Sequence, residues 1–150
     1  MVGGLIALVV VLAAASAAGV ALRQRQGRFH QRTPGHDQPS SADALSAADL
    51  GAPLGARATL VQFSTEVCAY CGPTRALLTE VARERDGVSF VEIDAAERMD
   101  LTRRLRVLST PTVLVLDALG GITSRASGPL RRAELLTAVG AALQTSGNAS

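Results

Sequence analysis

The chain has 150 residues, a formal net charge of +2 and an apolar fraction of 47%. Its length predicts one domain with appended segments. Every one of the 15 basic residues is arginine, and residues 57–150 carry a net charge of only +1, so no basic stripe indicates a nucleic-acid-binding surface.

An uncharged apolar run covers residues 2–22 near the N-terminus. As a helix it would be about 31 Å long, which matches the hydrocarbon core of a bilayer. The alternative is a cleaved signal peptide, because the alanine-rich stretch 13–18 offers small-residue cleavage sites. However, no arginine precedes the run, and it is longer than an ordinary signal-peptide core. We therefore expect residues 1–22 to be a transmembrane signal anchor that contacts the membrane through residues 2–22.

Four arginines follow the apolar run within ten residues: Arg23, Arg25, Arg28 and Arg32. The positive-inside rule then predicts a single-pass protein of the cell membrane whose soluble domain faces the cytoplasm. An extracytoplasmic facing is the alternative, since redox-active cysteine pairs work on both sides of membranes. Residues 23–56 are rich in polar and small residues and predict a basic juxtamembrane segment and flexible linker, with a short helical turn near residues 42–50.

From residue 57 onward, the apolar patterns alternate in the order βαβαββα. Strands are expected at 59–64, 88–93, 112–116 and 122–127, and helices at 69–85, 95–105 and 131–144. The third strand is continuously apolar and therefore central, while Met99, Leu101 and Leu105 of the short helix are expected to point inward. We expect an α/β domain of residues 57–146 with a mixed central sheet, followed by a disordered tail at 147–150.

The only two cysteines, Cys68 and Cys71, lie where the first expected strand meets the first helix. A helix N-terminus favours a thiolate, which suits Cys68 as the nucleophile. Cys71 lies one turn later and can resolve a mixed disulfide. The pattern predicts a redox-active Cys68–Cys71 disulfide without a cofactor. Two alternatives stay open: a binding module whose thiolates hold a soft metal such as Cu(I), and a tethered scaffold.

No resident metal site is expected. A structural zinc site needs four ligands, and the chain has two cysteines. Its two histidines, His30 and His36, lie in the expected linker, far from the dithiol.

The element order, the dithiol and the segment Ser109-Thr110-Pro111-Thr112 before the third strand resemble the thioredoxin family over about residues 57–145. Residues 62–68 have the spacing of the thioredoxin strand that leads into Trp-Cys-Gly-Pro-Cys. Pro111 follows Cys68 by 43 residues, close to the family value. A monothiol register centred on Cys71-Gly72-Pro73-Thr74 is the alternative, but it needs gaps that the dithiol register does not. The resemblance implies a thioredoxin-like three-layer sandwich.

The resemblance also implies roles for individual residues. Pro111 is expected to be cis, and Tyr70, Thr110 and Pro111 are expected to line a substrate groove where the Thr110 backbone pairs with an extended partner segment. Gln62 replaces the buried acid that assists proton removal from the second cysteine, so a proton relay at Gln62 departs from the family. Val67 replaces the tryptophan before the first cysteine. We expect a monomer that reduces protein disulfides, draws electrons from a thiol reductant and binds no nucleic acid.

Overall fold

The computed structural model describes Val11, Ser16, His30–Gln31 and residues 44–147 of the chain. The predicted anchor at residues 2–22 therefore lies almost entirely outside the described residues, as do His36 and residues 148–150. In the part of the chain that is described, no helix has the length and apolar character needed to cross a membrane.

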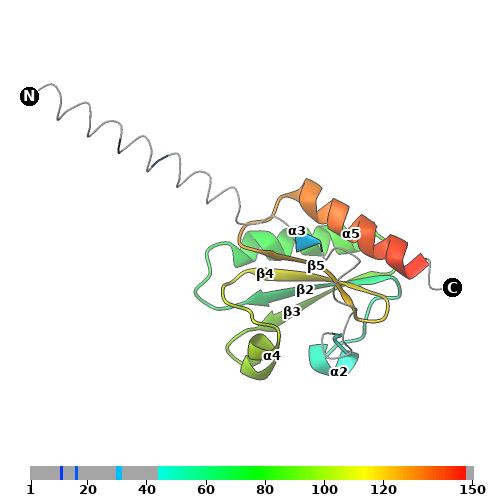
Figure 1. The fold of residues 1–150 in the computed structure, drawn as a ribbon, viewed down its shortest axis with the longest axis horizontal. Coiled ribbons are helices and arrows are strands. Elements are labelled where there is room, and N and C mark those ends of the chain that lie inside the picture. The colour runs from blue at the N-terminus through cyan, green and yellow to red at the C-terminus, as the bar shows by residue number, and fades with distance from the viewer. Residues whose placement is uncertain (1–10, 12–15, 17–29, 32–43, 148–150) are drawn as a thin grey trace, which may run out of the picture.

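A mixed five-stranded sheet forms the centre of the domain (Figure 1). Its strands are β1 (His30–Gln31), β2 (Ala58–Ser64), β3 (Val88–Asp94), β4 (Thr112–Asp117) and β5 (Ile122–Ser127). Their order across the sheet is β1-β5-β4-β2-β3, and only the β2–β3 pair is parallel. β4 is the middle strand, as its uninterrupted apolar sequence predicted.

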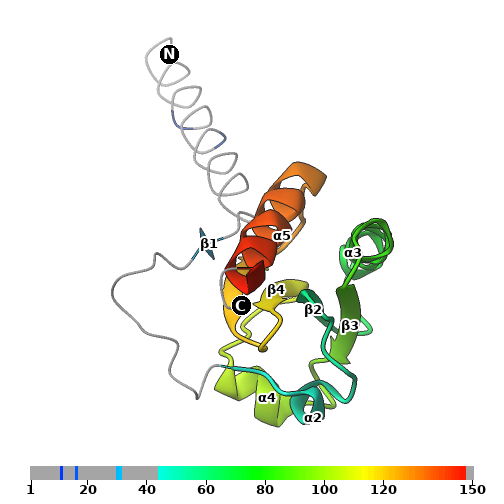
Figure 2. The same cartoon turned by 90° about the vertical axis from the view of Figure 1, so that its right-hand side faces the viewer.

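Helices cover both faces of this sheet. They are α2 (Ala47–Leu50), α3 (Cys71–Glu84), α4 (Met99–Arg104) and α5 (Arg132–Gly147). Figure 2 shows α3 and α5 on one face and α2 and α4 on the other. From β2 onward the element order is βαβαββα, so the predicted α/β sandwich of three layers is confirmed.

Each face of the sheet has its own apolar core, because successive side chains of a strand point to opposite faces. Leu60 of β2 packs on the α3/α5 face with Leu78, Val113, Leu135 and Val139. Phe63 of the same strand packs on the α2/α4 face, where the cluster includes Val61, Ile93, Leu101, Leu105, Leu114 and Leu116. One strand therefore contributes to both cores.

The domain begins earlier than the boundary predicted at residue 57. Leu45 and Leu50 are buried in the core of the α2/α4 face, and the Leu45 amide donates to the carbonyl of Gly120 at 2.9 Å. Ser46 caps α2 through a reciprocal pair of hydrogen bonds with Asp49. His30–Gln31 also pairs with the edge of β5. The helical turn predicted near residues 42–50 is present as α2, but the predicted flexible linker does not extend to residue 56, because Leu45 and Leu50 are buried on the α2/α4 face.

The second predicted helix also differs from the observed one. It begins at Met99 and not at residue 95, because the Asp94 carboxylate accepts hydrogen bonds from the backbone amides of Ala96 and Glu97 in a turn. Leu101 and Leu105 point inward as expected. The inward orientation predicted for Met99 is wrong, since this residue is 50% exposed.

Candidate active site

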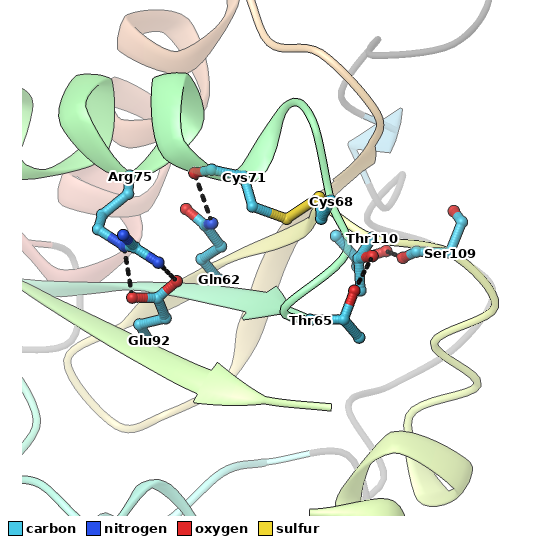
Figure 3. Close-up of a disulfide and its surroundings, with 9 residues drawn as sticks. Gln62, Thr65, Cys68, Cys71, Arg75, Glu92, Ser109 and Thr110 are labelled. Carbon is cyan, nitrogen blue, oxygen red and sulfur yellow. Dashed lines mark hydrogen bonds and ion pairs between the residues drawn. A yellow bond between two sulfur atoms is a disulfide. The ribbon is translucent and has the colours of Figure 1, made fainter. Parts of the chain in front are cut away.

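The two cysteines lie at the junction of β2 and α3 and form a disulfide bond (Figure 3). Cys68 is partly exposed, whereas Cys71 is the first residue of α3 and only 3% exposed. A partner can therefore reach the first cysteine far more easily than the second. The bond joins both cysteines at one junction, in agreement with the dithiol register.

Backbone hydrogen bonds hold the turn that carries the dithiol. The Cys71 amide donates to the Cys68 carbonyl at 3.3 Å, and the Thr74 amide donates to the Tyr70 carbonyl at 3.1 Å. Pro73 lies in the first turn of α3, where a missing N–H costs no helical hydrogen bond. α3 thus starts two residues later than predicted, and Cys68 lies just before its N-terminus. The positive end of the helix dipole remains close enough to favour a thiolate there.

Gln62 is fully buried on β2, beneath the first turn of α3. Its Nε2 atom donates to the carbonyl oxygen of Cys71 at 3.0 Å. Its Oε1 atom has no hydrogen-bond partner among the described residues. The hydrogen bond from Nε2 joins β2 to the backbone of Cys71. The proton relay at Gln62 stays a prediction.

The loop before β4 lies against the end of β2. The peptide bond between Thr110 and Pro111 is cis, as expected from the sequence. Because Phe63 is in register with Thr112, Pro111 lies beside the point where the chain leaves β2 for the dithiol. The side chains of Thr65 and Thr110 meet there, with 3.0 Å between their Oγ1 atoms (Figure 3). Thr110 and Pro111 are thus next to the segment that leads into Cys68.

Exposed apolar side chains are found on both of these loops. Val67 is 96% exposed and Tyr70 is 53% exposed on the dithiol segment, and Leu108 is 93% exposed on the loop before β4. They are three of the five large apolar side chains that are exposed between residues 44 and 147. Removing apolar surface of this kind from water is energetically favourable, so these side chains favour contact with a partner.

An ion pair joins α3 to the edge strand β3 next to Gln62. The Arg75 guanidinium donates to both carboxylate oxygens of Glu92, at 2.6 and 2.7 Å (Figure 3). Glu92 is the register partner of Gln62 on the adjacent strand. The hydrogen bonds from Arg75 lower the pKa of the Glu92 carboxyl below its ordinary value. No pattern in the sequence indicated this pair, whose members are 17 residues apart.

Arg125 of β5 is a second residue that was not among the predicted site residues. Its guanidinium donates to the carbonyl oxygens of Leu105 and Arg106, at 2.6 and 2.7 Å. Arg106 has a positive φ of 50°, so the chain turns sharply at this point. Arg125 therefore holds the start of the loop that ends at Pro111. A charged residue inside an expected strand was the one available sequence signal.

Among the described residues, no group of three or more His, Cys, Asp or Glu side chains could hold a metal ion. The dithiol is the reactive group that this site offers.

A family model described as Thioredoxin matches residues 51–141. The chain belongs to the thioredoxin family. A comparison with curated proteins found no match. Among solved structures, chloroplastic thioredoxin z is 30% identical to this chain and aligns with a TM-score of 0.52. The alignment covers 58% of this chain and 79% of the other.

Two further solved structures are similar in fold alone. Thioredoxin f from spinach chloroplast, in its short form, is 24% identical, with a TM-score of 0.52 over 59% of this chain and 78% of the other. A malarial protein is 16% identical, with a TM-score of 0.53 over 58% of this chain and 98% of the other. A thioredoxin domain that carries a Cys-x-x-Cys disulfide is the arrangement of a thiol–disulfide oxidoreductase.

Proposed function

We propose that this protein is a membrane-anchored oxidoreductase that reduces the disulfide bonds of other proteins. The observation that carries the proposal is the disulfide between partly exposed Cys68 and buried Cys71 at the junction of β2 and α3. This asymmetry suits a dithiol in which one sulfur meets the partner and the other reacts only internally.

The reaction begins with Cys68 as a thiolate, which attacks one sulfur of the partner's disulfide. A bond forms between Cys68 Sγ and that sulfur, the partner's disulfide breaks, and its second sulfur leaves as a thiolate that takes up a proton. Cys71, once deprotonated, attacks Cys68 Sγ. The intramolecular disulfide forms and the first partner sulfur is released as a thiol. Two electrons pass to the partner, and a thiol reductant returns two electrons to the Cys68–Cys71 disulfide.

Gln62 bears on the second of these steps. Its buried amide is neutral and is a far weaker proton acceptor than a carboxylate, so we expect the proton of Cys71 to pass to water or to a released partner thiolate. We therefore expect resolution of the mixed disulfide to be slower than in relatives that have a buried acid at this position.

We infer that the partners are proteins because of the surface around the dithiol. Val67 and Tyr70 present exposed apolar side chains on the segment that carries Cys68, and Leu108 presents one on the loop before β4. An extended partner segment that lies across both loops would cover them. The backbone of Thr110 would pair with this segment as an added strand, with Pro111 beneath it. A small disulfide would leave most of this surface exposed.

The anchor at residues 2–22 and the cytoplasmic facing of the domain belong to the same proposal. The four arginines of residues 23–32 support that facing, and a reducing compartment favours reduction over oxidation. A reporter that is active only in the cytoplasm, fused after Ser150, tests it. Activity only of a periplasmic or lumenal reporter would contradict it.

The catalytic test uses the full-length protein in detergent micelles, with insulin as the protein disulfide and dithiothreitol as the reductant. Cys68→Ser should abolish the accelerated reduction of insulin. Cys71→Ser should instead accumulate a mixed disulfide between Cys68 and an insulin chain, visible on a non-reducing gel. Copper that co-purifies with an inactive wild type and is lost in both variants would favour Cu(I) binding. Wild-type behaviour of both variants would favour a scaffold.

The direction of exchange is tested by the reduction potential of the Cys68–Cys71 couple in glutathione and dithiothreitol buffers. A value of about −250 mV or below is expected for a reductase, because it lies at the reducing end of the range of roughly −270 to −120 mV that family members span. A value of about −150 mV would point to an oxidant or isomerase and would contradict the proposed direction.

A further inference from the structure

Two loops that are far apart in the sequence meet at the dithiol through a pair of threonine hydroxyl groups. Thr65 is the first residue after β2 and lies three positions before Cys68. Thr110 directly precedes Pro111 and lies 45 positions after Thr65. Their Oγ1 atoms are 3.0 Å apart, which is hydrogen-bonding distance, and either hydroxyl can donate (Figure 3).

The loop before β4 is held firmly at its two ends. At its start, Arg125 donates to the carbonyl oxygens of Leu105 and Arg106. At its end, the carbonyl oxygen of Pro111 accepts from the Gly128 amide at 2.8 Å. These contacts tie the loop to β5 and to the segment that follows it. They do not set the position of the loop relative to Cys68.

Of the hydrogen bonds that the structure describes, the Thr65–Thr110 contact is the one that joins the dithiol segment 65–70 to the loop 105–111. Both side chains are β-branched, so χ1 has few alternatives and a bond between the hydroxyls holds each side chain in one rotamer. Beside the β2–β4 register, this contact therefore fixes the Thr110 side chain, and with it the Thr110 backbone, relative to the segment that carries Cys68.

We propose that Thr65 is a positioning residue for protein substrates: its hydroxyl holds Thr110 where the backbone of an extended partner segment can pair with it while the partner's disulfide reaches Cys68. The inference rests on the proposed function. Thr65 itself does not react with the substrate, and its effect passes through Thr110. Binding of protein disulfides should therefore depend on the Thr65 hydroxyl, whereas the chemistry of Cys68 should not.

The size of the substrate separates these two effects. A protein disulfide lies in an extended segment that uses the Thr110 backbone. A small aromatic disulfide such as dithiobis(nitrobenzoic acid) needs only an accessible Cys68 thiolate. Loss of the Thr65 hydroxyl should raise KM for the protein and leave the reaction with the small disulfide unchanged.

The experiment compares full-length variants in detergent micelles with insulin and with dithiobis(nitrobenzoic acid). Thr65→Val keeps the shape of the side chain without the hydroxyl and should raise KM for insulin about fivefold, the factor expected when one partly buried hydrogen bond is lost. The kcat for insulin and the rate with the small disulfide should stay within about twofold of wild type. Thr65→Ser, which keeps a hydroxyl, should restore most of the wild-type KM.

Two further variants complete the test. Thr110→Val should raise KM for insulin as Thr65→Val does, and the double variant should be no worse than either single one, because both remove the same bond. Thr137→Val on α5, whose hydroxyl donates within its own helix to Ala133, is the matched control and should behave as wild type. The Thr110→Val comparison decides the matter if Thr65→Val does not fold.

The inference is overturned if the wild type is active and the Thr65→Val and Thr110→Val variants keep its KM for insulin. It is also overturned if either variant slows both substrates equally, because the hydroxyls would then affect Cys68 or the fold and not partner positioning. A wild type that reduces neither substrate would overturn the proposed function itself, and this inference with it.

Discussion

The two faces of the sheet differ in what their buried side chains do. On the α3/α5 face, Gln62 of β2 donates to the backbone of Cys71, so this face holds the reactive turn. On the α2/α4 face, Phe63, the next residue of the same strand, is the largest fully buried side chain of the domain. Neighbouring positions of one strand thus serve the dithiol and the fold separately. Substitutions one residue apart should have different consequences.

The largest effect is expected from Phe63→Ala. Phe63 is fully buried, and its truncation leaves a cavity in the α2/α4 core, so the free energy of unfolding should fall by about 3–5 kcal/mol. Urea unfolding of the oxidised full-length protein measures this loss. The reduction potential of the dithiol should not change, because the cavity lies on the opposite face. A shifted reduction potential would contradict the conclusion that the two faces serve the dithiol and the fold separately.

Gln62→Glu tests the other face through its pH dependence. Burial disfavours the charged form, so the folded pKa of the introduced carboxyl should exceed its unfolded value of about 4.3. Below that pH both states are protonated and the cost is small. As the pH rises, the unfolded state ionises first, and the loss of stability should grow to roughly 3 kcal/mol at neutral pH.

Gln62→Met is the matched neutral variant for this test. Its stability relative to wild type should hardly depend on pH, and unfolding curves between pH 3 and pH 8 compare the two. A constant difference between Gln62→Glu and wild type over this range would show that position 62 is not shielded from water.

Leu45→Ala tests whether the segment before residue 57 belongs to the α2/α4 face. Leu45 is 1% exposed but lies near the start of the continuous segment 44–147. Neighbouring side chains can there partly fill the cavity that its truncation leaves. We expect the free energy of unfolding to fall by about 2–3 kcal/mol. Leu119→Ala, at a position that is 80% exposed, is the control and should change stability by less than about 0.5 kcal/mol. Equal changes in unfolding free energy for the two variants would contradict the placement of Leu45 in the core.

The smallest effect concerns the surface ion pair on the α3/α5 face. Arg75 lowers the pKa of Glu92 in the folded protein, so the stabilisation is fully present above the unfolded pKa of the carboxyl and is lost as the pH falls through the folded pKa. Glu92→Gln should thus be less stable than wild type at neutral pH and equal to it in acid. The difference should be small because the pair is solvent-exposed, and it should shrink in high salt.

Urea unfolding as a function of pH, with and without 1 M salt, measures this difference. Glu97→Gln, an exposed glutamate in the turn before α4, is the control. If Glu92→Gln matches wild type at neutral pH, then the ion pair does not stabilise the position of α3 on β3.

Much of the fold could be predicted from the sequence because its determinants are local. Apolar alternation and helical spacing predicted the β2–α3–β3 unit, the central β4 and the hairpin to β5. Two sequence features located the site: the cysteines three positions apart, and the proline that enters β4. The error at Met99 has a local cause as well, because residues two positions apart in a helix lie on nearly opposite faces, and Leu101 takes the inward one.

The α/β class, the dithiol and the proline loop before β4 could be predicted without a structure, since each depends on residues within one or two turns of chain. Three contacts became evident only in the folded chain: Leu45 in the core, Arg125 against the loop before β4, and Thr65 against Thr110. These contacts join residues tens of positions apart, and their partners are set by strand register and by which face each side chain takes. Periodicity in a single segment holds no information about either.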